Sequence, residues 1–423
     1  MIRVGVAKQT ITPKLGTLLS GYPRIREAKT VADDLEVTAI AISSEKQTAL
    51  FISATLTCIG EEVVNEIKEL IKDKFCISLA VICATHTHSG PNMYNGWLPI
   101  DQAYKDEVFI PQTLLAIEQA LANQQVAKVG VGRTESTVGI NRRLLWEGEI
   151  VLDENPEGVF DKNMFVISFV SNDNKPICNI VSYPAHATST RGDEDWYCVT
   201  RDWPGVMVDA LQQHTGAITV FFNGAEGDVA PRRPAGMTEG LAMKEKVGKQ
   251  ASEDAIRAYQ TITEYKEVEL KVFEDVIKIP YDKLPNLEDT KQKLKEYGDE
   301  QVGVRLKEKQ KLLKVIEAYN QEIKTHKTLN QIVIGLGDIA FVPFPFEPFT
   351  KVSLDLRDAS PYKNTLIISN ANGCNGYLPD AIEIKKGGYE VWNFKNSDAY
   401  VLTDNADEEI IKEIVRLLNQ IKK

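Results

Sequence analysis

Residues 164–186 read MFVISFVSNDNKPICNIVSYPAH, two apolar runs separated by a short polar stretch. Runs of this length, rich in Val, Ile and Phe and bounded by Asn, Asp and Pro, predict β-strands at residues 164–170 and 177–183. The second predicted strand ends three residues before His186. This histidine is therefore expected at the junction of a strand and a loop, where functional side chains concentrate.

Similar runs predict further strands on both sides of this stretch, at residues 37–43, 49–54, 78–84, 128–133, 218–223, 268–279, 331–336 and 366–370. Amphipathic patterns between them predict helices at residues 61–72, 110–122, 204–213, 241–260, 348–357 and 407–420. Strands and helices do not alternate as strictly as in a doubly wound fold. The pattern predicts a mixed α/β fold in which mixed β-sheets are packed in layers with flanking helices.

One segment, residues 286–328, differs from the rest because it is dense in charge and carries apolar residues at helical spacing. It predicts a charged helical hairpin inserted into the globular unit, with a break near residues 298–303. A solvated flap, a lid and a dimerisation arm are the alternatives for its role. Since no repeat, low-complexity tract or linker is visible, residues 1–423 are expected to form a single domain.

The composition is that of a soluble, folded protein, with 43% hydrophobic and 26% charged residues among 423. With 49 Lys and Arg against 60 Asp and Glu, the formal net charge of -11 argues against nucleic acid or an anionic membrane as a partner. No run approaches the roughly 20 apolar residues that cross a bilayer, and the N-terminus lacks the apolar core of a signal peptide. A cytoplasmic location is expected, and the oligomeric state stays open, a homo-oligomer included.

Three of the five histidines lie in two short motifs. His86 and His88 occupy ATHTHSGP (residues 84–91), directly after a predicted strand, and His186 occupies SYPAHATST (182–190). Alternate residues of an extended segment point to the same side, so the imidazoles of His86 and His88 are expected to point to the same side. The pair could supply two metal ligands, one ligand and one catalytic neighbour, or a structural contact.

Two further segments carry carboxylates in unusual surroundings. NGAEGDVAP (residues 223–231) follows a predicted strand, and its Asp228 either caps a tight turn or serves the site. FVPFPFEPF (341–349) places Glu347 within an apolar, proline-rich run. Because an isolated buried charge is too costly, Glu347 must be paired, protonated or bound to a metal, and metal ligation is favoured.

Six motifs follow one another in a fixed order: ATHTHSGP, GINR (139–142), the strand ending before His186, NGAEGDVAP, FPFEPF (344–349) and NGYLPD (375–380). Together with the opening ITPKLGTLLSGY (11–22), they resemble the catalytic domain of the neutral/alkaline non-lysosomal ceramidases. The resemblance extends from about residue 2 to about residue 420. Each motif alone is weak evidence, whereas six in order are specific.

The resemblance implies a zinc-dependent hydrolase with one zinc ion. In that family two histidines, a glutamate and a tyrosine hold the metal, and the matching residues here are His86, His186, Glu347 and Tyr377. It also implies that His88 stays off the metal and moves a proton to the leaving group. Arg142 and Tyr389 match two residues that orient the substrate or stabilise its oxyanion. Asp228 is expected to orient a zinc-bound histidine or the water.

The sequence departs from the family pattern at one functional position. The family loop reads GDVSP, and its serine has been proposed as a nucleophile, whereas this chain reads GDVAP with Ala230. A methyl group cannot attack a carbonyl, so the reaction is expected to use water activated by zinc. The family's C-terminal β-sandwich domain is also not expected, because the chain ends with the predicted helix 407–420. Ceramide is therefore not the expected substrate.

Tryptophans and charged residues near the motifs suggest a polar substrate. The residues expected to bind it are Trp97, Trp146, Arg191, Trp196 and Arg201. Flat tryptophan faces suit a sugar ring, although ordinary packing and a solvated loop are the alternatives. The expected substrate is a small polar amide, for example one derived from a sugar. A lactone or ester hydrolase with the same zinc, or a non-catalytic zinc-stabilised binding protein, are the rival interpretations.

Overall fold

The computed structural model describes residues 1–96, 98–298 and 303–422. Across these residues the larger sheet has eight strands, in the order β13 (Ile218–Asn223), β11 (Pro176–Tyr183), β10 (Asn163–Ser171), β6 (Gln125–Glu135), β1 (Ile2–Thr10), β3 (Glu36–Ser43), β4 (Thr48–Ala54) and β5 (Leu79–Ala84). The sheet is mixed, because β4–β5 and β11–β13 pair in parallel and the other neighbours are antiparallel.

Both faces of this sheet are buried, which explains why its strands appear in the sequence as nearly continuous apolar runs. Along β10, Phe165 and Ile167 face the core shared with the second sheet, whereas Met164 and Val166 face helices. Successive side chains of a strand point to opposite faces, so a strand covered on both sides needs apolar residues at every position. The two strands predicted within residues 164–186 are confirmed as β10 and β11.

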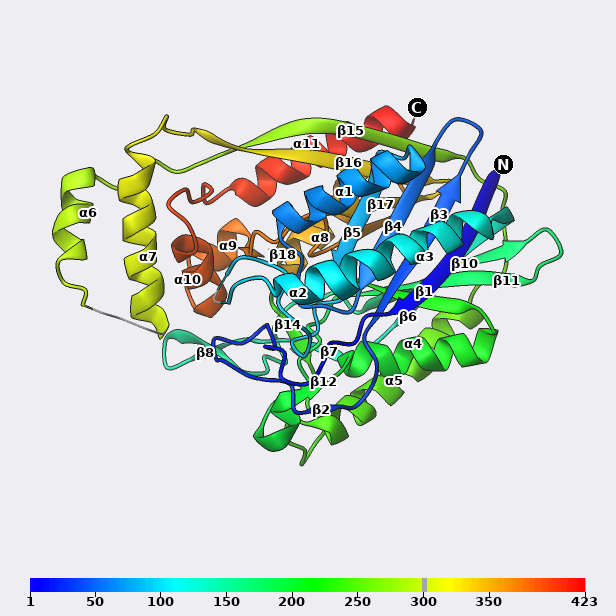
Figure 1. The fold of residues 1–423 in the computed structure, drawn as a ribbon, viewed down its shortest axis with the longest axis horizontal. Coiled ribbons are helices and arrows are strands. Elements are labelled where there is room, and N and C mark those ends of the chain that lie inside the picture. Colours follow the sequence, from blue (N-terminus) through cyan, green and yellow to red (C-terminus); the bar gives the residue numbers. More distant parts are fainter. Residues whose placement is uncertain (97, 299–302, 423) are drawn as a thin grey trace.

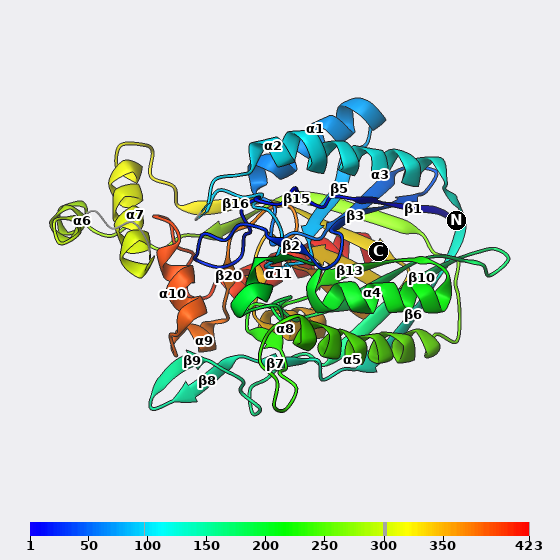
Figure 2. The same cartoon turned by 60° about the horizontal axis from the view of Figure 1, so that its bottom comes forward.

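Four helices cover the outer face of the larger sheet. α1 (Glu61–Phe75) and α3 (Ile110–Ala122) pack on the half formed by β1, β3, β4 and β5. α4 (Asp202–Thr215) and α5 (Leu241–Gln260) pack on the half that contains β10, β11 and β13. Figure 2 shows these two pairs of helices along opposite sides of the body. None of the helices in the described ranges combines the length and the apolar character needed to span a bilayer.

The second sheet lies against the inner face of the first. Within the described residues its four strands run in the order β15 (Leu270–Pro280), β16 (His326–Leu336), β17 (Ile339–Pro343) and β19 (Asn364–Ile368). Phe341 and Leu366 belong to the core shared with the larger sheet, and the Phe341 and Phe51 ring centroids are 5.1 Å apart. α8 (Thr350–Ala359) and α11 (Ala406–Lys422) cover the outer face. The predicted mixed α/β fold with layered sheets and flanking helices is confirmed.

The larger sheet curls, so that its two edges approach each other. The Ser53 hydroxyl on β4 donates to the carbonyl of Phe221 on β13 at 2.8 Å. The side-chain amide of Asn223, at the end of β13, donates to the carbonyl of Thr85, directly after β5, at 3.3 Å. The carboxyl ends of β5 and β13 therefore meet, although these strands lie at opposite ends of the strand order.

The charge-dense segment contains two helices at one end of the molecule, α6 (Leu287–Leu294) and α7 (Gly303–Ala318) (Figure 1). The expected break near residues 298–303 falls largely on residues 299–302, which lie outside the described part. The helical region is shorter than predicted, because residues 326–328 already belong to β16. α7 packs beside α10 (Tyr389–Asn396), where the Lys307 ammonium donates to Asn393 Oδ1 at 2.6 Å.

Short strand pairs tie together the loops that carry the motifs. The four pairs are β2 (Thr30–Val31) with β12 (Cys198–Val199), β7 (Gly139–Asn141) with β14 (Val229–Pro231), β8 (Arg143–Trp146) with β9 (Glu149–Leu152), and β18 (Glu347–Pro348) with β20 (Tyr377–Leu378). Four short helical pieces complete the described elements: α2 (Gln102–Tyr104), a π-helix (Lys105–Phe109), a 3-10 helix (Asp193–Tyr197) and α9 (Ala381–Ile384). The pairs fix loops that would otherwise be only loosely held.

Candidate metal centre

His86 and His88 follow β5. The His86 Nδ1–H donates to the carbonyl of Thr57 at 2.7 Å, and because a carbonyl only accepts, the lone pair of His86 Nε2 is left for a cation. His86 has a φ of 69°, a left-handed conformation that costs a residue other than glycine about 1–3 kcal/mol. The segment is therefore not simply extended. His86 Nε2 and His88 Nε2 nevertheless lie 3.2 Å apart, although the extended segment from which their shared direction was predicted is not present at His86.

His186 follows β11, as predicted, and is fully buried. Its Nδ1–H donates to the carbonyls of Glu226 at 2.8 Å and Val229 at 3.0 Å. These two acceptors fix the tautomer, so His186 Nε2 also carries a free lone pair. The rings of His86 and His186 are 4.7 Å apart between centroids, although 100 residues separate them in the sequence.

Glu347, on β18, brings a carboxylate to the two imidazoles. Its Oε2 lies 3.4 Å from His86 Nε2 and 3.3 Å from His186 Nε2. Glu347 Oε2 and His186 Nε2 are buried and have no hydrogen-bond partner among the described residues. Buried hydrogen-bond acceptors that lie close together without a partner fit a bound cation. Two imidazoles with one carboxylate are a ligand set typical of catalytic zinc. The described residues thus include groups able to hold a metal ion.

The pKa values of His86, His186 and Glu347 indicate which of these groups is protonated when no metal is bound. Burial disfavours the charged form of His86, but the Glu347 carboxylate outweighs it and raises the pKa of His86 to about 9. Burial and the charge of Arg142 lower the pKa of His186 to about 3. The pKa of Glu347 is held well below its usual range, because the two histidines overcome the effect of burial. One proton on His86 therefore occupies the place that a cation would take.

Glu226 is a second carboxylate at this site that the sequence analysis did not identify. It follows β13 and is fully buried, and burial raises its pKa to about 8. Its Oε1 accepts a hydrogen bond from the Asn370 side chain at 2.6 Å, and its Oε2 has no partner in the described part of the chain. Glu226, His86 and Glu347 place ligand atoms within 4.8 Å of one another. The sequence did contain a signal for Glu226, because this acid lies three residues after the end of the apolar run that forms β13. His186 has the same spacing from the end of β11.

Asp228 occupies a different place from the one expected. Its Oδ1 accepts from the Thr350 amide at 2.8 Å and the Thr350 hydroxyl at 2.9 Å, and its Oδ2 accepts from Asn141 Nδ2 at 3.3 Å. These bonds tie the loop after β13 to the start of α8. Asp228 was predicted to orient a zinc-bound histidine or the water; backbone carbonyls orient both histidine rings, so the first of these roles is wrong and the second stays a prediction. Asp228 instead fixes the loop that supplies two of these carbonyls.

Arg142, Tyr377 and the buried Glu390 form a hydrogen-bonded network beside Glu347. Arg142 donates to Tyr377 Oη at 3.0 Å and to Glu390 Oε1 at 2.8 Å. The second oxygen of Glu390 accepts from Arg143 at 2.7 Å. Tyr377 is the strand partner of Glu347 in the β18–β20 pair, which places it next to the proposed ligands. Burial raises the pKa of Tyr377 well above its usual value, with Glu347 acting in the same direction.

Tyr389 lies at the edge of this network. Its ring centroid is 6.0 Å from that of Tyr377, and 44% of the residue is exposed to solvent. The structure therefore places Tyr389 between this network and the surface. This is a position from which it could contact a bound substrate.

Two of the residues predicted to bind substrate lie close to His88. The Tyr22 ring is 4.8 Å from His88 and 5.5 Å from Trp196, measured between centroids. The Arg191 guanidinium lies 5.9 Å from the centre of the Trp196 ring. Trp146 is on β8, and 61% of the residue is exposed to solvent. Trp97, the remaining tryptophan of this group, lies outside the described residues.

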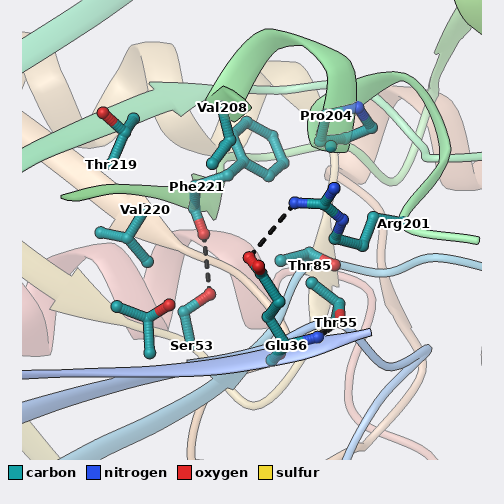
Figure 3. Close-up of a pocket in the computed structure, with 12 residues that line it drawn as sticks. Glu36, Ser53, Thr55, Thr85, Arg201, Pro204, Val208, Thr219, Val220 and Phe221 are labelled. Atoms are coloured by element: carbon teal, nitrogen blue, oxygen red, sulfur yellow. Dashed lines mark hydrogen bonds and ion pairs between the residues drawn. The ribbon is translucent and has the colours of Figure 1, made fainter. Parts of the chain in front are cut away.

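Arg201 is buried among acidic side chains rather than exposed to a substrate. Its guanidinium contacts the carboxylates of Asp33, Glu36 and Asp209, and only 8% of the residue is exposed. Figure 3 shows Arg201 beside Glu36 in a cavity of about 20 Å³ at the seam where β4 approaches β13. The prediction for Arg201 is wrong, because three acids satisfy this arginine within the core.

Comparison with known proteins identifies structures with the same fold. No family profile matches the sequence, and no curated protein matches it either. The crystal structure of neutral ceramidase from Pseudomonas aeruginosa superposes with a TM-score of 0.78 at 18% identity, covering 99% of this chain and 75% of that one. A ceramidase complexed with C2 superposes with a TM-score of 0.76 at 17% identity, covering 100% and 75%. The chain therefore has the fold of the neutral ceramidases.

Proposed function

We propose that this protein is a zinc-dependent hydrolase of a small polar amide, with residues 1–423 acting as one catalytic domain. The observation that carries the proposal is the convergence of two imidazoles on one carboxylate: Glu347 Oε2 lies 3.4 Å from His86 Nε2 and 3.3 Å from His186 Nε2, and neither Glu347 Oε2 nor His186 Nε2 has a hydrogen-bond partner among the described residues. The ceramidase fold supports amide cleavage as the reaction class. Tyr377 is the proposed fourth ligand.

Zinc, when bound, would polarise the scissile carbonyl and lower the pKa of water from about 15.7 towards 7. The protein's part is to hold this donor set and leave one face open. Arg142 holds the Tyr377 hydroxyl at 3.0 Å, and Glu390 holds Arg142 in turn. Arg142 and Tyr389 are proposed to orient the carbonyl and to stabilise the oxyanion that forms in the transition state.

His88 is proposed to carry the proton from water to the leaving amine. Burial and the neighbouring His86 hold its pKa well below the usual range, so the His88 ring is neutral at pH 7 in the metal-free protein. Its Nδ1 is buried and has no partner in the described structure, whereas Nε2 faces His86 Nε2 at 3.2 Å. His88 is thus less firmly held than His86 and His186, whose Nδ1 atoms are both fixed by carbonyls.

Ala230 supports direct use of water. It lies on β14, paired with Ile140 of β7, and offers no nucleophilic atom. The test of the proposed function combines metal analysis of the purified protein with a panel of N-acyl amino sugars, esters, sugar lactones and ceramide. Turnover of polar amides by zinc-loaded protein supports the proposal, and an Ala230→Ser variant should turn over the same amides without forming an acyl-enzyme.

The same panel decides between the rivals. Preference for lactones or esters would indicate the alternative hydrolase with the same metal site. A protein that holds zinc and binds ligands but turns over nothing would indicate a binding protein. Preference for ceramide would refute the polar substrate.

We expect zinc binding at pH 7 to release about one proton from the site. The pKa of His86 is about 9 in the metal-free protein, so below that pH its Nε2 carries a proton that must leave before a metal can bind. The apparent zinc affinity should therefore rise about tenfold per pH unit between pH 6 and 8. Competition titrations with a zinc chelator measure this slope. An affinity that is independent of pH would show that zinc displaces no proton from the site in this range, which contradicts a protonated His86 in the metal-free protein.

A further inference from the structure

Three arginines lie close to two aromatic rings, Tyr22 and Trp196, near His88. The guanidinium carbons of Arg24, Arg26 and Arg191 lie 5.0, 5.9 and 5.9 Å from the centre of the Trp196 ring. Those of Arg26 and Arg191 also lie 4.7 and 5.8 Å from the centre of the Tyr22 ring. These five residues are called the arginine–aromatic cluster below.

The cluster is adjacent to the candidate metal centre and is firmly attached. The Tyr22 ring lies 4.8 Å from His88, and the His88 ring lies 4.8 Å from the proposed ligand His86. Tyr22 and the first two arginines belong to the loop before β2, whereas Arg191 and Trp196 precede β12. The β2–β12 pair joins these two loops, and Arg26 donates to the carbonyls of Trp196 and His88, both at 2.8 Å.

The arginines of the cluster lack carboxylate partners. Within the described ranges, none of the three forms an ion pair within 4.0 Å, whereas Arg142, Arg143 and Arg201 each do. Asp202 and Glu239 are the acids close enough to raise the pKa of Tyr22. The Asp202 carboxylate is already engaged by the amides of Ser189 and Thr190. The three arginines of the cluster thus keep their positive charge without a direct carboxylate contact among the described residues.

The unsatisfied polar atoms in the cluster are donors. Tyr22 Oη, Arg26 Nε and Trp196 Nε1 are all buried without a hydrogen-bond partner among the residues described. An arginine and an indole nitrogen can only donate, and a tyrosine hydroxyl donates readily. A buried donor without a hydrogen bond is costly, so a group that binds at these donors must supply hydrogen-bond acceptors. A carboxylate, sulfate or phosphate is rich in acceptors and carries the opposite charge.

We infer that the arginine–aromatic cluster is a subsite for an anionic group of the substrate, placed one ring away from the metal centre. The inference rests on the proposed function and narrows its substrate class to polar amides that carry a carboxylate, sulfate or phosphate. Arg24 and Arg191, which are exposed, reach the anion from outside, and Arg26 and Tyr22 contact it from within. The Trp196 face packs against the adjoining part of the substrate.

Calorimetric titration of the zinc-free protein tests this subsite independently of catalysis. The probes are matched by charge: N-acetyl-L-glutamate against N-acetyl-L-glutamine, and N-acetylglucosamine 6-phosphate and 6-sulfate against N-acetylglucosamine. Each anionic probe accepted by the subsite is expected to bind about 10- to 100-fold more tightly than its neutral partner, as charge-assisted hydrogen bonds provide. The relative affinities of the three anions distinguish carboxylate, phosphate and sulfate as its preferred group. Equal binding of all charged and neutral partners overturns the inference.

The double variant Arg24→Gln/Arg191→Gln should abolish this preference while keeping the circular dichroism spectrum and melting temperature of the parent. The matched control is Arg133→Gln, which removes an exposed arginine stacked on Phe165 elsewhere in the protein and should keep the preference. A preference that survives in the double variant, or is lost equally in the control, refutes the subsite.

The outcome is separable from that of the proposed function. Turnover of neutral amides with no anionic preference refutes the subsite and leaves the hydrolase intact. Arginine-dependent anion binding by a protein that hydrolyses nothing when loaded with zinc supports the subsite and refutes the hydrolase.

Discussion

Replacing His186 with alanine is expected to remove zinc from the protein and to lower turnover by at least about 10³-fold. His186 is fully buried, its tautomer is fixed by the carbonyls of Glu226 and Val229, and its Nε2 faces Glu347 Oε2 at 3.3 Å. Removing it takes away one of the three proposed ligand atoms, the others being His86 Nε2 and Glu347 Oε2. Zinc content by mass spectrometry and amide turnover measure the two effects separately.

Two further histidine variants complete this experiment. His88→Ala should keep most of the zinc and lose turnover by about 10²–10⁴-fold, because His88 moves a proton and is not a proposed ligand. His214→Ala, near the end of α4, should change neither quantity. Loss of zinc from His88→Ala would make His88 a ligand, and full zinc retention in His186→Ala would refute the proposed donor set.

Replacing Glu390 with glutamine is expected to lower the free energy of unfolding by about 3–5 kcal/mol. Glu390 is fully buried, and its two oxygens accept from Arg142 at 2.8 Å and Arg143 at 2.7 Å. The Glu390→Gln change leaves the guanidinium groups of Arg142 and Arg143 without the negative charge that compensates them. A buried charge without its partner is strongly destabilising. Urea unfolding at fixed zinc concentration measures the loss.

The matched control for Glu390 is Glu383→Gln. Glu383 also contacts Arg143, at 2.9 Å, but its side chain is 22% exposed and shares its charge with Lys386. Its replacement should cost about 1 kcal/mol. Because Glu390 also holds Arg142 against Tyr377, its variant should lose turnover even under conditions where it is folded, whereas Glu383→Gln should not. Equal stability losses in the two variants would contradict the proposed role of burial.

Much of the local structure could be predicted from the sequence. The apolar runs at residues 164–170 and 177–183 form β10 and β11, because strands covered on both faces require apolar residues throughout. The ligand types were visible for a similar reason: an acid within FPFEPF cannot be buried without a partner, and Glu347 lies 3.3 Å from His186. The placement of His86 and His186 at strand ends followed from the same runs.

The tertiary structure decided which of these side chains meet. Glu226 and Asp228 are two residues apart in one loop, yet the former reaches His86 and Glu347 whereas the latter bonds to Thr350. Arg201 is close in sequence to His186 but is held by three acids at the seam of the curled sheet. Asp209 is only eight residues from Arg201, but the other two acids, Asp33 and Glu36, and the Thr350 partner of Asp228 are more than 100 residues away, so the local sequence does not distinguish these outcomes.

By itself, the sequence determined where the strands run, which residue types stand at their ends and what chemistry those types can perform. Burial and backbone periodicity act over a few residues, so both are expressed locally. Only the folded chain decided that the ends of β5 and β13 meet, through the Ser53–Phe221 and Asn223–Thr85 hydrogen bonds. The curl of a sheet is set by the packing of all its strands and helices together, and this packing brings two imidazoles and a carboxylate from three distant segments to one point.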